Sequence, residues 1–220
     1  MRFAVRVAGV LALGTLLALV GCRAMAGLGI LFSPRQIQKA EFELTPGRLA
    51  LVIDHAHAGQ ADPVFDLNLH NRLVELFRDN NVPARVVPYD EVVRLRQANR
   101  DFSSWSIQRA GRRLNAEQVL YVRIEDLRLR PSSDDPVITP EVGLNVKVIG
   151  VREPTVHARL WPDKDAETEG RWLTHRRQPK EVENRDVIDA EAAKLARETA
   201  YYVARHFHKY DLEVKPPREP

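Results

Sequence analysis

The chain has 220 residues, of which 44% are hydrophobic, and carries 33 Lys and Arg against 30 Asp and Glu. This length suits one domain better than two, and this hydrophobic fraction is sufficient for a core, so the composition argues against a disordered chain. The single cysteine, Cys22, excludes an internal disulfide.

The N-terminal residues have the pattern of an export signal. Arg2 and Arg6 supply early positive charge, and an apolar stretch follows over residues 7–20. A basic start, a short apolar core and small residues at the cleavage point are the parts of such a signal. The segment Leu19–Cys22, with the sequence LVGC, resembles the lipobox of bacterial lipoproteins. The resemblance implies that residues 1–21 are removed and that the new N-terminal Cys22 carries lipid.

An uncleaved membrane anchor with a free or buried cysteine is the alternative. The first apolar run covers about 14 residues, whereas a helix that spans a membrane needs roughly 20. Residues 24–32 are apolar again, and Arg23 is the one charge between positions 7 and 32, so the alternative stays open. Because Arg rather than Asp follows Cys22, the sorting rule of such lipoproteins implies the outer membrane.

Export also bears on the partners. Removal of residues 1–21 takes away two arginines, so 31 basic residues face 30 acidic ones and the net charge falls from +3 to +1. An exported, nearly neutral chain argues against nucleic acid as a partner. We expect a signal peptide at 1–21, a lipidated tether at 22–41, an α/β domain at 42–210 and a disordered tail at 211–220.

The first part of the domain predicts a strand–helix–strand unit. Residues 40–44 alternate in polarity like a short strand, and residues 48–54 form the continuous apolar run of a strand covered on both faces. Asp62 and Pro63 predict the start of a helix, because Asp caps free amides and Pro fits the first turn. Residues 84–88 predict a second, parallel strand. The apolar stripe of the helix consists of Phe65, Leu69, Leu73, Leu76 and Phe77.

Helices and a long strand are predicted next. Asp90 is expected to cap one helix, and another is expected to start near Ser103 or Ser104. Residues 118–130 predict a long strand whose outer face, with Arg123, contacts water.

Residues 142–148 and 156–160 alternate in polarity and predict two half-buried strands of a hairpin. Residues 171–177 predict a further strand. The last helix is expected to start at Asn184 or Asp186. His206 and His208 are expected at its C-terminal end, where positive charge suits the helix dipole.

The predicted element order is β-α-β-α-(α)-β-β-β-β-α. It predicts an α/β fold with a single mixed sheet, helices packed on the sheet and a long C-terminal helix. Behind a lipid anchor, this order resembles the α/β domain of envelope assembly lipoproteins. These include the TolB amino-terminal domain, CsgG-like secretion lipoproteins and lipoprotein activators of penicillin-binding proteins. The resemblance covers residues 42–210 and implies a non-enzymatic role in binding and positioning other envelope proteins.

His55 and His57 are the candidates for a metal site. They form an H-x-H at the end of the first central strand, where both would point to the same side. Imidazole is a proper ligand for Zn or Mn. However, a metal-dependent hydrolase also needs ligands from other strands, and the later sequence offers no second cluster of that kind. The pattern favours a polar loop, and we expect neither a metal nor another cofactor.

Arginine and tryptophan residues predict an interaction patch, because aromatic residues and Arg are enriched at interface cores. Its target would be an acidic protein, an anionic lipid or an anionic cell-wall polymer. The alternative is a set of solvated faces neutralised by the acidic residues between positions 163 and 169. The candidate residues are Arg109, Arg112, Arg113, Trp172, Arg176 and Arg177.

The sequence lacks G-x-S-x-G, G-x-x-x-x-G-K-[ST], G-x-G-x-x-G and H-E-x-x-H. We therefore expect a non-catalytic, membrane-anchored envelope lipoprotein that recruits or regulates a protein complex. One alternative is a metal-dependent hydrolase that uses His55 and His57. Another is a self-assembling structural lipoprotein whose strands at 118–130 and 142–160 pair between chains at a sheet edge.

Overall fold

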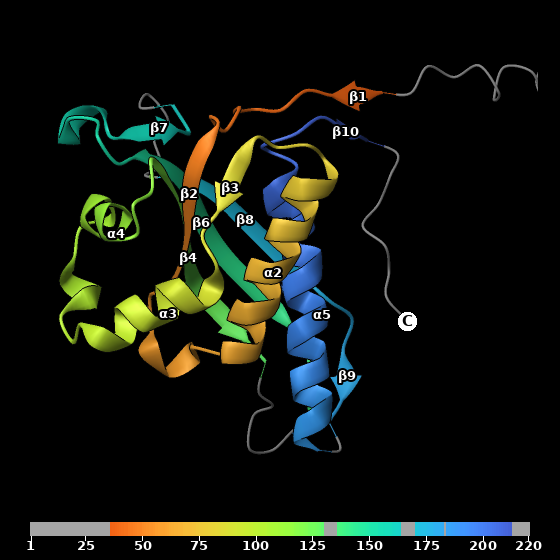
Figure 1. The fold of residues 1–220 in the computed structure, drawn as a ribbon. Coiled ribbons are helices and arrows are strands. Elements are labelled where there is room, and N and C mark those ends of the chain that lie inside the picture. The colour runs from red at the N-terminus through yellow and green to blue at the C-terminus, as the bar shows by residue number, and fades with distance from the viewer. Residues whose placement is uncertain (1–35, 130–135, 164–169, 183, 213–220) are drawn as a thin grey trace, which may run out of the picture. The chain divides into compact units, whose positions relative to one another are not determined.

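The computed structural model describes residues 36–129, 136–163, 170–182 and 184–212 (Figure 1). The predicted signal peptide, Cys22 and residues 213–220 of the predicted tail lie outside these ranges. The main unit comprises residues 38–210 of the described chain. Among the helices of the described residues, none is long and apolar enough to cross a membrane.

The main sheet has the strand order β3-β2-β4-β6-β7, and β8 also pairs with β6. β2 is parallel to both β3 and β4, whereas β6 is antiparallel to β4, β7 and β8. The sheet is therefore mixed, and the predicted α/β class is confirmed. The strands are β2 (Gly47–His55), β3 (Ala84–Val86), β4 (Gln118–Arg128), β6 (Glu141–Gly150), β7 (Arg159–Trp161) and β8 (Arg171–Arg176).

Helices cover both faces of this sheet (Figure 1). α2 and α5 pack on one face, where their apolar residues join Leu51, Leu120 and Leu144 in the larger core. α3 and α4 pack on the other face around Val119 and Ile149. The helices are α2 (Pro63–Asp79), α3 (Tyr89–Ala98), α4 (Ile107–Arg113) and α5 (Arg185–Ala204).

The first helix forms for the reasons that its sequence predicts. The side chain of Asp62 accepts a hydrogen bond of 2.9 Å from the amide of Phe65, and Pro63 occupies the first turn. All five residues of the predicted apolar stripe are buried. Asn184 caps α5 in the same way, since its Oδ1 accepts from the amide of Val187 at 3.2 Å.

Two local predictions in the first half of the domain are wrong. Residues 40–44 form no strand, because the amides of Glu41 and Phe42 donate to the carbonyl of His206 at 2.9 and 3.1 Å. Asp90 caps no helix, because α3 begins one residue earlier, at Tyr89, with Pro88 at the cap position. Asp90 lies in the first turn of α3, and its carboxylate pairs with Arg94 one turn later at 2.7 Å.

The predicted start of α4 also shifts. Ser106 caps α4, and Ser103 and Ser104 lie in the short 3-10 helix η2 (Phe102–Ser104). β7 is shorter than expected, because the exposed Val156 lies in η3 (Thr155–His157). The remaining short elements are η1 (Ala58–Gln60), β1 (Ile37–Gln38), β5 (Val137–Ile138), β9 (Lys180–Glu181) and β10 (Tyr210–Asp211).

The short strands pair with each other, β1 with β10 and β5 with β9. The predicted tether thus contains a strand near its end, and Asp211 belongs to a strand rather than to a disordered tail.

In the main sheet, β4 and β6 are both paired on two sides. Neither β4 nor β6 therefore has a free edge among the described residues, whereas β7, which begins inside the predicted 142–160 segment, is an edge strand, as are β3 and β8.

Candidate functional site

The carboxyl end of β2 is the place where this topology favours a ligand. The chain leaves β2 through α2 to reach β3 on one side, and later reaches β4 on the other side through α3 and α4. Ligands of open α/β sheets bind at such reversals, outside the carboxyl ends of the strands. Asp54 and His55 end β2 at this point.

The polar side chains at this end of β2 bond to one another. Nε2 of His55 lies 2.9 Å from Oδ1 of Asp66, and both side chains are largely buried. The hydroxyl of Tyr121 donates to Oδ2 of Asp54 at 2.8 Å. Burial and the neighbouring Asp54 carboxylate raise the pKa of Tyr121, so its hydroxyl keeps its proton at neutral pH. These contacts join the end of β2 to α2 through Asp66 and to β4 through Tyr121.

The two candidate metal ligands have different surroundings. His55 bonds to Asp66, whereas His57 is exposed to solvent. Within the described ranges, no group of three or more His, Cys, Asp or Glu residues is arranged to hold a metal ion. The geometry therefore gives no support to the hydrolase alternative.

His70 is expected to make the stability of the domain depend on pH. Its Nε2 donates to the carbonyl of Val87 at 3.1 Å, and its ring centroid lies 5.3 Å from that of Tyr89. Burial lowers the pKa of His70 below its ordinary value of 6.5. The unfolded chain therefore binds a proton on this residue at a higher pH than the folded chain does. Its contribution to stability is complete above the unfolded pKa and declines as the pH falls through that value towards the folded pKa.

Urea unfolding at about pH 7.5 and pH 5 tests this expectation. The midpoint should fall at the lower pH, and it should fall less in His70→Gln, whose amide can still donate to Val87. An equal fall in both proteins would contradict the assignment.

The C-terminal histidines are not helix-dipole groups, so that prediction is wrong. α5 ends at Ala204, and both His206 and His208 are buried beyond it. Nδ1 of His206 lies 2.9 Å from Oε1 of Glu41, yet burial outweighs this carboxylate and lowers the pKa of His206. A lowered pKa favours neutral imidazole and not the cation that a helix dipole would stabilise.

The predicted arginine and tryptophan patch divides into three groups. On α4, the guanidinium of Arg109 stacks 4.0 Å from the ring centroid of Trp105, and Arg112 and Arg113 lie on the same helix. Trp172 and Arg176 lie on β8, and both are exposed. The side chain of Arg177 is only 16% exposed. These six residues are therefore not one surface.

Arg177 bridges two acids of α5. Its Nε donates to Glu191 at 3.0 Å, and its second nitrogen pairs with Glu198. The other oxygen of Glu198 lies 2.7 Å from Nε2 of His175. No sequence pattern described above predicts this cluster. The available signal is that Glu191 and Glu198 are seven residues apart, which places both on the face of α5 that carries Leu195.

The second face of the main sheet is covered over only part of its length. α3 and α4 bury its first part, but Arg123, Trp172 and Thr174 further along are exposed. Register pairs place Asn145 between Arg123 and Trp172. We call this part the open face. Its exposed residues are Arg123, Trp172, Thr174 and Arg176, and between them lie the half-buried Glu141 and Gly143 and the buried Asn145.

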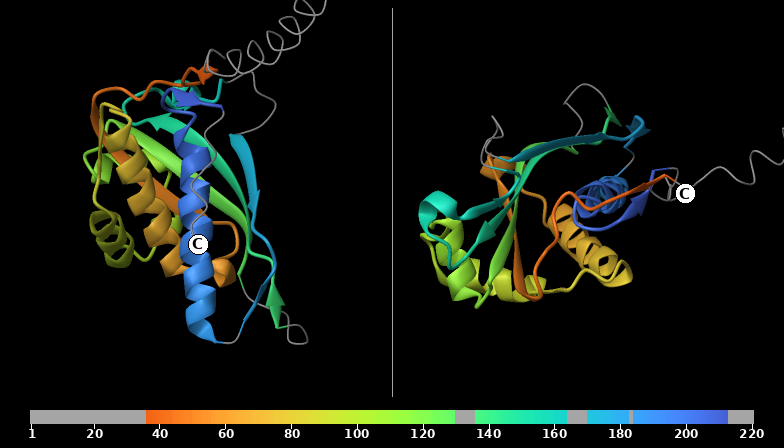
Figure 2. Two further views of the ribbon diagram at one scale, coloured as in Figure 1. Left: turned by 90° about the vertical axis from the view of Figure 1, so that its right-hand side faces the viewer. Right: turned by 90° about the horizontal axis from the view of Figure 1, so that it is seen from above.

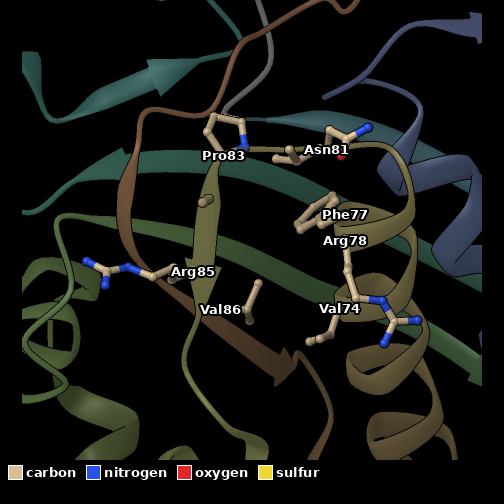
Figure 3. A pocket seen from close by; sticks show the side chains of 9 residues that line it. Val74, Phe77, Arg78, Asn81, Pro83, Arg85 and Val86 are labelled. Carbon is tan, nitrogen blue, oxygen red and sulfur yellow. The ribbon is translucent and has the colours of Figure 1, made fainter.

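Two pockets lie elsewhere. One, of about 430 Å³, lies between α2 and β3, where Phe77 and Val86 project into it and the guanidinium groups of Arg78 and Arg85 point away (Figure 3). The other, of about 580 Å³, shares Asn81–Pro83 with the first and is also lined by residues that include Thr45, His208 and Lys209. The lining of the first pocket is mostly apolar, without an acid or a histidine, and so offers no general acid or base.

No protein-family model and no curated protein matches the chain. Solved structures are similar to it at low identity. The PelC dodecamer from Paraburkholderia phytofirmans is 12% identical, with a TM-score of 0.36 over 79% of this chain and 96% of that one. The lipoprotein GNA1162 from Neisseria meningitidis is also 12% identical, with a TM-score of 0.39 over 71% and 99%.

A minor lipoprotein from Acinetobacter baumannii is 11% identical, with a TM-score of 0.38 over 74% of this chain and 92% of that chain. Two of these three structures are thus of bacterial lipoproteins. At such identities and TM-scores, the likeness carries no conclusion about what this chain binds or does.

Proposed function

We propose that this chain is a bacterial envelope lipoprotein, held on the outer membrane by lipid on Cys22, whose α/β domain binds other envelope proteins without catalysing a reaction. The lipobox-like segment Leu19–Cys22 and the preceding basic and apolar residues support the anchor. Arg23, directly after the cysteine, supports the outer membrane over the inner one.

Trp172 is the observation that carries the binding role. It is 53% exposed, on the open face. Trp and Arg are enriched in interface cores relative to the rest of a protein surface, and this supports a binding role for the open face. At the carboxyl end of β2, by contrast, Tyr121 engages Asp54 and Asp66 engages Nε2 of His55, whereas Nδ1 of His55 is buried without a hydrogen-bond partner among the described residues.

Replacing Cys22 by Ser is expected to abolish membrane anchoring by lipid. Wild-type protein should stay in the outer-membrane fraction, and its intact mass should show loss of residues 1–21 and gain of acyl groups. Cys22→Ser should be soluble or keep the uncleaved signal, whereas Ser33→Ala, in the tether, should behave as wild type. Unchanged mass and membrane retention of Cys22→Ser would overturn the anchor.

The binding role is tested by cross-linking intact cells that carry a C-terminally tagged chain, followed by mass spectrometry of the purified adducts. A discrete set of envelope proteins is expected. A ladder of this chain alone would favour the self-assembling alternative, and the absence of any adduct would contradict recruitment.

A further inference from the structure

Strand β8 is the outermost strand on one side of the main sheet (Figure 2). It pairs with β6 over Arg171–Arg176, and no strand of the described residues pairs with its other side. An unpaired edge presents a row of backbone amide and carbonyl groups that an extended chain can bond. Six residues give an edge of about 20 Å, enough for an added strand.

Positive charge lies at both ends of this edge. β8 contains Arg171 and Arg176 and no acidic residue. Because they are five positions apart, Arg171 and Arg176 point to opposite faces of the sheet. Their side chains are 51% and 63% exposed.

Both arginines are incompletely neutralised. Arg171 lies 3.4 Å from Oε1 of Glu41, and the same oxygen lies 2.9 Å from His206. Arg176 lies 3.6 Å from Oε2 of Glu141, which also contacts Arg128 at 3.5 Å. Charge-assisted bonds to carboxylates are normally about 2.7–2.9 Å. Each guanidinium carries five N–H donors and therefore keeps donors for a further acceptor.

Trp172 adds an apolar contact on the open face. It lies on the same face of β8 as Thr174 and Arg176. Thr174 pairs in register with Gly143, where an added Cβ would meet no atom within 4 Å. The space over the sheet at Gly143, next to Thr174, is therefore open. Trp and Arg are the residues that most often dominate the energy of protein interfaces.

We propose that the edge of β8 binds an extended acidic segment of another envelope protein as an added strand. This inference rests on the proposed function. Two carboxylates of the segment, five residues apart, face Arg171 and Arg176, and an apolar side chain lies beside Trp172. The spacing follows because side chains of an added strand alternate between the faces in step with those of β8.

The simpler reading is that the arginines guard the edge against aggregation, since charge on an edge strand disfavours pairing. Charge reversal separates the two roles. Glu protects an edge against pairing as Arg does, but it repels an acidic segment. Lys, like Arg, both protects the edge and attracts an acidic segment.

The experiment places a photo-reactive phenylalanine analogue at position 174 of the full, membrane-bound chain in living cells. A second chain carries the analogue at position 67, because Leu67 is 41% exposed on α2 and far from β8 in sequence. The probe at position 174 should give an adduct with another protein, and the cross-linked peptide should carry two acidic residues five apart. The yield should fall by about tenfold or more in Arg171→Glu/Arg176→Glu, and it should persist in Arg171→Lys/Arg176→Lys.

Urea unfolding verifies that each variant is folded, and Arg171→Gln/Arg176→Gln replaces the Glu pair if that pair is not. Adducts that survive charge reversal, or that join position 174 to its own chain, to a second copy or to a polysaccharide, overturn the inference. A partner captured at position 67 but not at 174 overturns this inference and leaves recruitment standing. Capture at neither position, together with no adduct to the tagged chain, overturns the proposed function itself.

Discussion

Replacing Arg177 by Met is expected to lower the free energy of unfolding by about 3–5 kcal/mol, because a buried charge pair that loses one partner leaves the other charge uncompensated. Here two carboxylates would be left. The side chains of Glu191 and Glu198 are only 9% and 15% exposed, and Arg177 contacts both of them. His175 compensates Glu198 only in part, and Lys194, whose Nζ lies 3.9 Å from Glu191, is a more distant partner than Arg177.

Urea unfolding followed by tryptophan fluorescence measures this effect. The matched control is Arg176→Met, one residue earlier, whose exposed, long ion pair should contribute about 0–1 kcal/mol. If both variants lose the same stability, the bridge from Arg177, directly after β8, to α5 is not the stabilising contact inferred here.

Replacing Phe65 by Ala is expected to cost about 3–5 kcal/mol, through lost burial and the cavity left behind. Phe65 is 0% exposed and belongs to the larger core that joins α2 and α5 to the sheet. The same unfolding measurement applies. Leu67→Ala, two residues along the same helix at an exposed position, should change stability by no more than about 0.5 kcal/mol. A loss for Phe65→Ala as small as this would show that the core near α2 collapses around the missing ring.

Local sequence patterns determined the elements that later formed the core. The continuous apolar run at 48–54 required a strand covered on both faces, and β2 is that strand. The stripe from Phe65 to Phe77 required a helix with one buried face, and the cap at Asp62 located its start. Burial of apolar surface and local capping act over a few residues, so such patterns can be read without the tertiary structure.

The local errors arose where long-range contacts outweighed the pattern. Residues 40–44 alternate like a strand, but the carbonyl of His206, more than 160 residues later in the chain, takes the amides of Glu41 and Phe42. His206 and His208 looked like charged groups at a helix end, but both are buried beyond α5, and burial lowers the pKa of His206. Hydrogen bonds and desolvation between distant segments leave no periodic signal in the sequence.

By itself, the sequence determined the α/β class, the order of the main elements and the residues that fill the core, since each depends on short-range periodicity. The tertiary structure alone decided which arginines are exposed and which form buried ion pairs. Arg176 and Arg177 are neighbours with the same side chain, yet alternation along one extended segment exposes the first and buries the second against Glu191 and Glu198. Only the strand order showed that β8 is an edge, because a sheet edge is defined by which strands are neighbours in space.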